Sequence, residues 1–167
     1  MNGLQQKKAL LRAQVKPLAS KVQVDVSLLR ARLPEKAFDC VGLYQPLKDE
    51  PEVKGFPDKQ KVCWPKITDL AKSQMEFFES TGFQKSQYGF LEPEEESLLV
   101  LKQQISMILV PGLAFDTKGF RLGRGKGFYD RYLQGFDGVT VGVCSACLLY
   151  TSPSPRDQRG SRMPSSA

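Results

Sequence analysis

Ile105-Ser-Met-Ile-Leu-Val110 is a short run with five apolar residues in six, and it precedes the glycine-rich segment Arg121-Leu-Gly-Arg-Gly-Lys-Gly-Phe-Tyr-Asp130. A short apolar run without polar alternation is typical of a strand buried on both faces of a sheet. An apolar strand, a glycine-rich loop and a helical start form the layout in which backbone N–H groups hold phosphate. We therefore predict a phosphate site close to the end of this strand.

The glycine-rich segment combines backbone freedom with positive charge. Gly123, Gly125 and Gly127 allow the main chain to approach a ligand closely and to adopt positive φ where needed. Arg124 and Lys126 bring fixed positive charge to the same place, and the N-terminus of the following helix adds its dipole. This combination is suited to a polyphosphate.

Two known phosphate-binding fingerprints do not match this segment. The P-loop pattern fails because Phe120 occupies its first glycine position and Gly127 stands where a hydroxyl residue is required. The dinucleotide pattern fails because its last glycine position holds Phe128. Asp130 places a carboxylate beside the expected phosphates, and Mg²⁺ typically binds through one or two carboxylates plus phosphate oxygens. We predict a magnesium–nucleotide site, with a simple turn carrying basic surface residues as the alternative.

The rest of the chain alternates predicted helices and strands. Helices are expected at residues 4–18, 26–33 and 125–133, and a short one is expected to follow the acidic run 92–96 through residue 101. Strands are expected at 41–44, 62–64, 105–110 and 140–143, whereas 75–78 forms either an edge strand or a hairpin with 83–90. This alternation predicts an α/β fold, a single Rossmann-like three-layer domain whose mainly parallel sheet is flanked by helices.

Composition is that of an ordinary soluble domain. The 167 residues suit one domain with a substantial core, and 25% charged with 41% hydrophobic residues is typical of globular proteins. No apolar stretch approaches the roughly 20 residues that span a bilayer. The N-terminus is polar and basic and lacks a signal-type apolar region, so a cytoplasmic location is expected.

Charge and cysteine content narrow the classes of ligand. The basic residues behind the formal charge of +6 are scattered along the chain. This distribution favours anionic small molecules as ligands and argues against nucleic-acid binding, which needs clustered basic residues. Cys40 and Cys63 are expected to be buried free thiols. The Cys144-Ser-Ala-Cys147 pair has metal-binding spacing, but the sequence holds no second pair and no histidine, which argues against zinc.

The end of the chain differs in composition from the rest. From Thr151 onward it is rich in Ser, Pro and Arg and has one large apolar residue, Met163. Such a segment cannot bury enough surface to offset its ordering entropy. We expect residues 147–167 to be a disordered, non-native tail after a domain at 1–146, with a natural disordered tail as the alternative.

The run from Pro111 to Leu133 closely resembles the signature of the 5-formyltetrahydrofolate cyclo-ligases, also called methenyltetrahydrofolate synthetases. The resemblance extends over residues 4–143, with weaker markers at Lys8 and Arg12, Tyr44-Gln-Pro-Leu-Lys-Asp-Glu50, Pro65-Lys66 and Tyr88-Gly-Phe-Leu-Glu-Pro93. Members of that family continue with a further segment that nothing here matches. The resemblance therefore implies a cyclo-ligase-like domain that lacks its last segment.

The resemblance also implies a reaction. ATP and 5-formyltetrahydrofolate would be the small-molecule partners of a monomeric, Mg²⁺-dependent ligase that yields 5,10-methenyltetrahydrofolate, ADP and phosphate. The formyl oxygen would be phosphorylated, and N10 of the folate would then attack the activated carbon. The alternatives are an inactive fragment or homologue that binds folate or nucleotide, and an RNA-associated homologue.

Roles of individual residues follow from the same resemblance. The ATP-binding set would be Lys8, Arg12, Arg121, Leu122, Gly123, Arg124, Gly125, Lys126, Gly127, Phe128 and Tyr129. The catalytic residues would be Arg124, Lys126 and Tyr129, the folate would contact Glu50, Arg124 and Tyr129, and Asp130 would bind Mg²⁺. Phe128 replaces a tyrosine common at its place. Asp49 is expected to face solvent, and Asp116 to shape the turn before Gly119.

Overall fold

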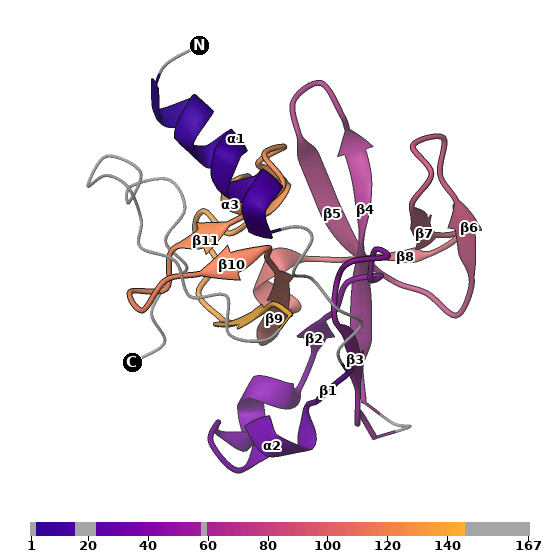
Figure 1. Ribbon diagram of the computed structural model, residues 1–167. Helices are drawn as coiled ribbons and strands as arrows, with labels where there is room; N and C mark the ends of the chain where they lie inside the picture. Colours follow the sequence, from indigo (N-terminus) through magenta and orange to yellow (C-terminus); the bar gives the residue numbers. More distant parts are fainter. Residues whose placement is uncertain (1–2, 16–22, 58–59, 146–167) are drawn as a thin grey trace.

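The computed structural model describes residues 3–15, 23–57 and 60–145 (Figure 1). The predicted end of the first helix at residues 16–18 and the predicted tail at 147–167 lie outside the described residues. The first helix, α1, is described over Gly3–Val15.

A six-stranded sheet forms the centre of the fold, in the order β12-β9-β2-β4-β5-β8. The strands are β2 (Val41–Gly42), β4 (Val62–Asp69), β5 (Gln74–Glu79), β8 (Leu98–Val100), β9 (Met107–Pro111) and β12 (Val139–Val143). The pairings β12–β9, β9–β2 and β2–β4 are parallel, whereas β4–β5 and β5–β8 are antiparallel. The predicted α/β fold with a mainly parallel sheet is confirmed.

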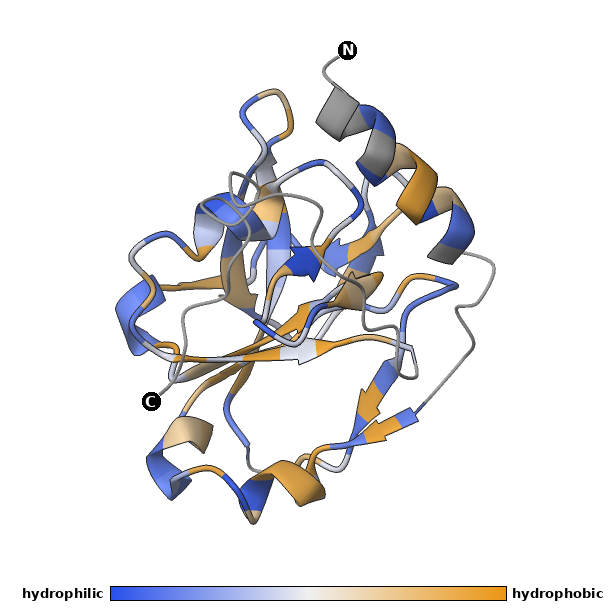
Figure 2. Ribbon diagram, turned by 60° about the vertical axis from the view of Figure 1, so that its left-hand side comes forward, coloured by the Kyte–Doolittle hydropathy of each residue, from blue (hydrophilic) through white to orange (hydrophobic). Residues whose placement is uncertain are grey.

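Burial on both faces explains why β9 lies inside the sheet. All five of its residues are buried. Ile108 and Val110 belong to one apolar core, whereas Met107 and Leu109 belong to the other. In Figure 2, much of the hydrophobic colour lies along these central strands. The predicted strand at 105–110 is thus confirmed, with its start displaced by two residues.

Short helices cover the two faces of the sheet. On the face of Ile108 and Val110, α3 (Phe128–Tyr132) contributes Tyr132 to the core. On the opposite face lie α2 (Ser27–Arg30) and the 3-10 helix η2 (Glu35–Phe38). They contribute Leu29 and Phe38 to the core on that face. A second 3-10 helix, η3 (Lys102–Gln104), precedes β9.

Three two-stranded sheets complete the fold. They join β1 (Gln23–Asp25) to β3 (Glu52–Lys54), β6 (Phe83–Lys85) to β7 (Leu91–Pro93), and β10 (Ala114–Phe115) to β11 (Arg121–Leu122). The β10–β11 hairpin leads into the glycine-rich segment. Asp116 shapes its turn as predicted, since Oδ1 accepts the N–H groups of Lys118 and Phe120 at 2.8 Å each.

The prediction of a helix over 26–33 was wrong in extent. Only Ser27–Arg30 is α-helical, and β1 directly precedes it. Asp25 Oδ1 accepts the N–H of Ser27 at 2.8 Å, which sets a turn between strand and helix. Leu33 directly precedes Pro34, and the helical conformation is disfavoured for such a residue, so the helix does not extend to the predicted end.

The predicted end of β4 at residue 64 was also wrong. The strand continues through Pro65 to Asp69. Since β2 pairs only with Val62 and Cys63, Pro65 lies beyond that ladder and its missing N–H removes no bond on that side. On the other side, β5 pairs along the whole extension, so β5 is an interior strand of the sheet and not the predicted edge.

The prediction of a short helix after the acidic run 92–96, through residue 101, was wrong. Leu98–Val100 forms β8 at the edge of the sheet, where its backbone pairs with β5. Glu92, at the start of the acidic run, lies in β7, which pairs with β6. Residues 83–90 accordingly form no hairpin with β5.

The remaining expectations on burial are met. Cys40 and Cys63 are buried free thiols. Within the described ranges, no helix combines the length and apolar character needed to cross a membrane.

Replacing Phe77 by alanine tests the core beneath α3. Phe77 is fully buried in β5 and its ring lies 5.0 Å from that of Tyr132. We expect Phe77→Ala to lower the free energy of unfolding by about 3–5 kcal/mol, measured by urea denaturation. Leu98→Ala, at a side chain that is 70% exposed, should change it by less than about 0.5 kcal/mol. Equal losses in both variants would contradict this assignment of the core.

Candidate functional site

The glycine loop, residues 123–127, connects β11 to α3. Gly125 and Gly127 have φ of +98° and +76°, a region that strains any side chain. A Cβ on Gly123 would lie 2.8 Å from Nη1 of Arg121, so a side chain at this position would displace the guanidinium group. Two glycines thus provide backbone conformation, and the third leaves room for a guanidinium group.

The helix after this loop is shorter than the predicted 125–133 helix. It begins at Phe128, with Gly127 as its left-handed N-cap and no side-chain cap. The reason is the positive φ at both glycines, which is incompatible with helical geometry before residue 128. The loop therefore has its own conformation, and a five-residue helix adds only a small dipole. Phe128 and Tyr132 both pack on the same core, as their spacing predicted.

Arg121 connects three parts of the site. Its side chain is 8% exposed, and its guanidinium donates to the carbonyl of Pro111 at 3.0 Å and to Asp130 Oδ1 at 2.7 Å. The same group lies over the ring of Tyr129, 5.4 Å from its centroid. Arg121 thereby connects the end of β9 to Tyr129 and Asp130 of α3.

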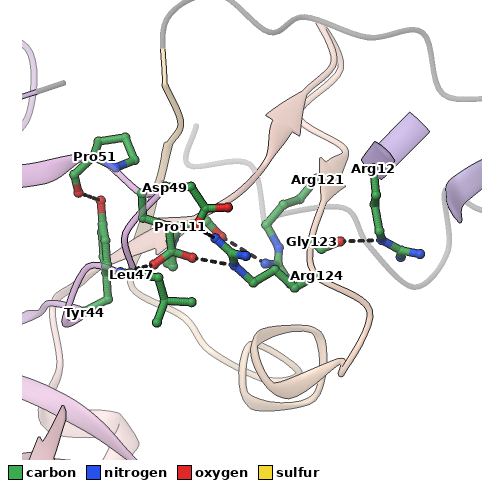
Figure 3. A network of polar contacts seen from close by, with 10 residues as sticks. Arg12, Tyr44, Leu47, Asp49, Pro51, Pro111, Arg121, Gly123 and Arg124 are labelled. Atoms are coloured by element: carbon green, nitrogen blue, oxygen red, sulfur yellow. Dashed lines mark hydrogen bonds and ion pairs between the residues drawn. The ribbon is translucent and has the colours of Figure 1, made fainter. Parts of the chain in front are cut away.

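Arg124 crosses from the glycine loop to the 45–50 loop (Figure 3). Its Nε donates to Glu50 Oε1 at 3.0 Å, and its Nη2 donates to Asp49 Oδ1. Glu50 is further held by the N–H of Leu47, 3.0 Å from Oε2. Burial lowers the pKa of Arg124, but the hydrogen bonds of Asp49 and Glu50 outweigh it and hold the pKa above its usual value. The expectation that Asp49 faces solvent was wrong, because its side chain is 21% exposed and pairs with Arg124.

The glycine loop is also held from the first helix. Arg12 Nε donates to the carbonyl of Gly123 at 2.8 Å (Figure 3), and its guanidinium lies 3.4 Å from the position of a Cβ on Gly125. Arg12 therefore lies directly against the loop. Lys8 is one turn earlier on α1 and is partly exposed.

A cleft of about 420 Å³ opens beside the loop. The predicted site residues that line it are Glu50, Arg121, Gly123, Arg124, Gly125, Lys126, Gly127, Phe128 and Tyr129. Lys8, Arg12, Leu122 and Asp130 are not in its lining. The side chain of Leu122 is 2% exposed and packs with Leu113 and Ala114, so only its backbone is suited to ligand contact.

Sequence reasoning missed most of the apolar side of the cleft. That side includes Pro65, Ile67 and Met75 of β4 and β5, together with Phe90, Leu91 and Glu92. Pro65 and the 88–93 segment were noticed as weak markers of the resemblance, but no role was predicted for them. A buried strand residue carries no local signal for the face on which it will meet a ligand.

Two tyrosines beside the cleft keep their protons at neutral pH. Burial, with the nearby charge of Glu50, raises the pKa of both Tyr44 and Tyr129. The hydroxyl of Tyr44 donates to the carbonyl of Pro51 at 2.6 Å, which fixes the start of the 45–50 loop relative to its end. Both phenols are therefore hydrogen-bond donors in this site.

Asp130 has the carboxylate chemistry of a magnesium ligand. Its Oδ1 accepts from Arg121, and its side chain remains 34% exposed. Among the described residues, no group of three or more Cys, Asp and Glu side chains is placed to hold a metal ion. A single carboxylate beside the glycine loop fits an ion that is held mainly by the oxygens of a bound phosphate.

Known proteins share the sequence pattern of this chain. Residues 5–151 match the sequence model of the 5-formyltetrahydrofolate cyclo-ligase family. The chain belongs to this family. Among curated members, a probable 5-formyltetrahydrofolate cyclo-ligase of Schizosaccharomyces pombe is 30% identical over 124 residues, covering 65% of this chain and 61% of the relative.

Other cyclo-ligases align over shorter stretches. The Haemophilus influenzae 5-formyltetrahydrofolate cyclo-ligase is 35% identical over 77 residues, which cover 44% of this chain and 41% of the relative. The Mus musculus enzyme is 27% identical over 107 residues, covering 56% of this chain and 53% of the relative. The chain thus spans between 41% and 61% of the length of these three relatives.

Solved structures share the fold. The Aquifex aeolicus 5,10-methenyltetrahydrofolate synthetase superposes with a TM-score of 0.64 at 27% identity, covering 96% of this chain and 94% of that one. The Mycoplasma pneumoniae 5,10-methenyltetrahydrofolate synthetase gives 0.51 at 21% identity, covering 83% and 73%, and supports the fold alone.

The buried hydroxyl of Tyr44 makes a pH-dependent contribution to stability. At neutral pH, Tyr44→Phe should lower the free energy of unfolding by about 1 kcal/mol, the usual value of one lost hydrogen bond. Because the folded-state pKa of Tyr44 is raised above its ordinary 10.0, the wild type loses stability as pH rises above that value, whereas the variant has no such phenol.

The difference between the two proteins should therefore shrink above pH 10, measured by urea denaturation from pH 7 to 11. A difference that stays constant over this range would contradict the raised pKa.

Proposed function

We propose that this cyclo-ligase family member converts 5-formyltetrahydrofolate to 5,10-methenyltetrahydrofolate, with conversion of ATP to ADP and phosphate. The observation that carries the proposal is the composition of the cleft. Its lining combines a cationic glycine loop, with Arg124 and Lys126, and apolar side chains from β4, β5 and the 88–93 segment. A phosphate chain and a flat ring system would meet in that space.

The proposed reaction has two chemical steps. The γ-phosphoryl group moves from ATP to the formyl oxygen, so that the bond to the ADP oxygen breaks and a C–O–P linkage forms. N10 of the folate then attacks the activated formyl carbon and loses its proton, and the C–O bond breaks to release phosphate. Such chemistry depends on positioning and charge neutralisation more than on a protein nucleophile. The absence of histidine from the chain is therefore compatible with it.

The glycine loop would bind the phosphates. Gly125 and Gly127 orient backbone N–H groups by their positive φ, and Lys126 is exposed on the cleft as a compact positive charge. Arg12 supports the loop from α1 through its bond to Gly123. Preorganised donors of this kind stabilise charge that develops on transferring phosphoryl oxygens.

The folate would lie between the loop and the apolar side. Tyr129 lines the cleft as a protonated phenol, and Glu50 is held in place by Leu47 and Arg124. Arg124 directs two donors at carboxylates, so a bidentate grip on phosphate requires this pair to open when substrates bind. Arg124 would then link occupation of the folate side to the phosphate side.

Asp130 would hold Mg²⁺ together with the phosphates of ATP. When bound, the ion neutralises charge on the phosphate oxygens. Arg121 keeps the carboxylate of Asp130 oriented through the 2.7 Å hydrogen bond.

Lys126 provides the direct test of the proposed activity. With Mg-ATP and 5-formyltetrahydrofolate, we expect the absorbance of the methenyl product to appear. Lys126→Ala should lower kcat/KM by about 10²–10³, because one donor to the developing charge is lost. Lys118→Ala, at an exposed lysine outside the cleft, serves as the matched control and should keep wild-type activity.

Two results would contradict this proposal. Equal activity of Lys126→Ala and wild type would show that Lys126 does not contribute to the reaction. A folded wild-type protein that binds both substrates without turnover would instead be a folate- and nucleotide-binding protein.

Asp130→Asn tests the metal assignment. Asparagine keeps an oxygen that accepts from Arg121 but removes the negative charge. At saturating ATP, we expect the Mg²⁺ concentration for half-maximal rate to rise about tenfold or more. Loss of a residue that only supports a metal ligand already lowers metal affinity about 10–100-fold. The thermal midpoint without Mg²⁺ is measured in parallel to check that the fold persists. An unchanged Mg²⁺ titration would show that Asp130 only orients Arg121.

A further inference from the structure

Glu92 is a buried carboxylate for which the reaction described above has no use. It lies in β7 between Leu91 and Pro93, its residue exposure is 8%, and it lines the cleft. Glutamate is rarely buried without a charged partner, because removing a carboxylate from water is costly unless hydrogen bonds compensate. A carboxylate held at the wall of a ligand cleft points to a ligand that compensates the cost.

Within the protein, Glu92 is only partly satisfied. Its Oε1 accepts the backbone N–H of Ile67 at 3.0 Å. Among the residues that the structure describes, the side chain of Glu92 makes this one hydrogen bond and no ion pair. An ionised carboxylate accepts about four hydrogen bonds, so most of its capacity is left for groups in the cleft.

The surroundings of Glu92 define the shape of that ligand. Ile67 and Met75 face each other across β4 and β5 and line the same cleft, together with Phe90 and Leu91. These side chains form an apolar surface beside a single negative charge. A flat ring with N–H donors along one edge matches this arrangement, whereas a metal ion would need further oxygen ligands.

We propose that Glu92 is a specificity-determining residue that accepts hydrogen bonds from N3–H and the 2-amino group of the pterin ring. This inference rests on the proposed function. The two N–H groups are adjacent and parallel on the pyrimidine edge, so they match the two oxygens of one carboxylate. N5, which carries the formyl group, is on the other ring of the bicycle. If Glu92 binds the pyrimidine edge, N5 and its formyl group lie at the far end of the ring system from Glu92. The glycine loop lines the same cleft and is available to that end.

The test measures folate binding without turnover. Calorimetry gives the Kd of 5-formyltetrahydrofolate, and of its analogue with methyl in place of the 2-amino group, for wild type and Glu92→Gln. Glutamine keeps an oxygen for the N–H of Ile67 but turns a donor toward the pterin edge. The matched control is Glu95→Gln, at an exposed glutamate outside the cleft lining.

We expect wild type to bind the natural compound ten- to a hundredfold more tightly than the analogue, on the order of one or two hydrogen bonds to a charged group. Glu92→Gln should lose a similar factor for the natural compound and little for the analogue. Glu95→Gln should behave as wild type. The Kd of Mg-ATP should be the same in all three proteins.

The outcomes separate this inference from the proposed function. If wild type binds 5-formyltetrahydrofolate and Glu92→Gln binds it within about twofold, Glu92 does not recognise the pterin, while the proposed function stands. If wild type binds neither folate, the proposed function fails and this inference fails with it. If Glu92→Gln does not fold, the wild-type preference over the analogue decides, and equal binding of the two compounds overturns the inference.

Discussion

The buried guanidinium of Arg121 is the interaction on which the geometry of the site depends. Its bonds to the carbonyl of Pro111 and to Asp130 attach the end of β9 to α3, and Gly123 is small enough to lie against it. A buried charge is costly to leave unpaired, so alternative arrangements of the loop that break the bond to Asp130 are disfavoured. The glycine loop is thereby held in one conformation despite its three glycines.

The contacts of Arg124 have a different character. Its side chain is 32% exposed, against 8% for Arg121, and its carboxylate partners lie on a separate loop. Arg121 therefore connects the end of β9 to α3, whereas Arg124 connects the glycine loop to the 45–50 loop.

The parts of the fold that were predicted correctly depend on local pattern. The apolar run 105–110 is short and lacks polar alternation, a pattern typical of an interior strand, and β9 is buried along its whole length. The positive φ of Gly125 and Gly127 agrees with the prediction that these positions need conformations that only glycine adopts readily. By contrast, β8 was mistaken for a helix, because the residues after the acidic run 92–96 have no local feature that shows their pairing with β5. Asp49 was expected in solvent, since its partner Arg124 is 75 residues away.

By itself, the sequence determined the class of the fold, the family and the position of the glycine loop, because each depends on residues that are neighbours in the chain. Only the tertiary structure decided which carboxylates are paired, which are buried and which face the cleft. Asp49, Glu50, Glu92 and Asp130 are chemically alike in the sequence, yet Asp49 and Glu50 share Arg124, Asp130 pairs with Arg121, and Glu92 accepts a backbone N–H from Ile67. The physical reason is that desolvation and pairing are set by partners from distant segments, which no local pattern encodes.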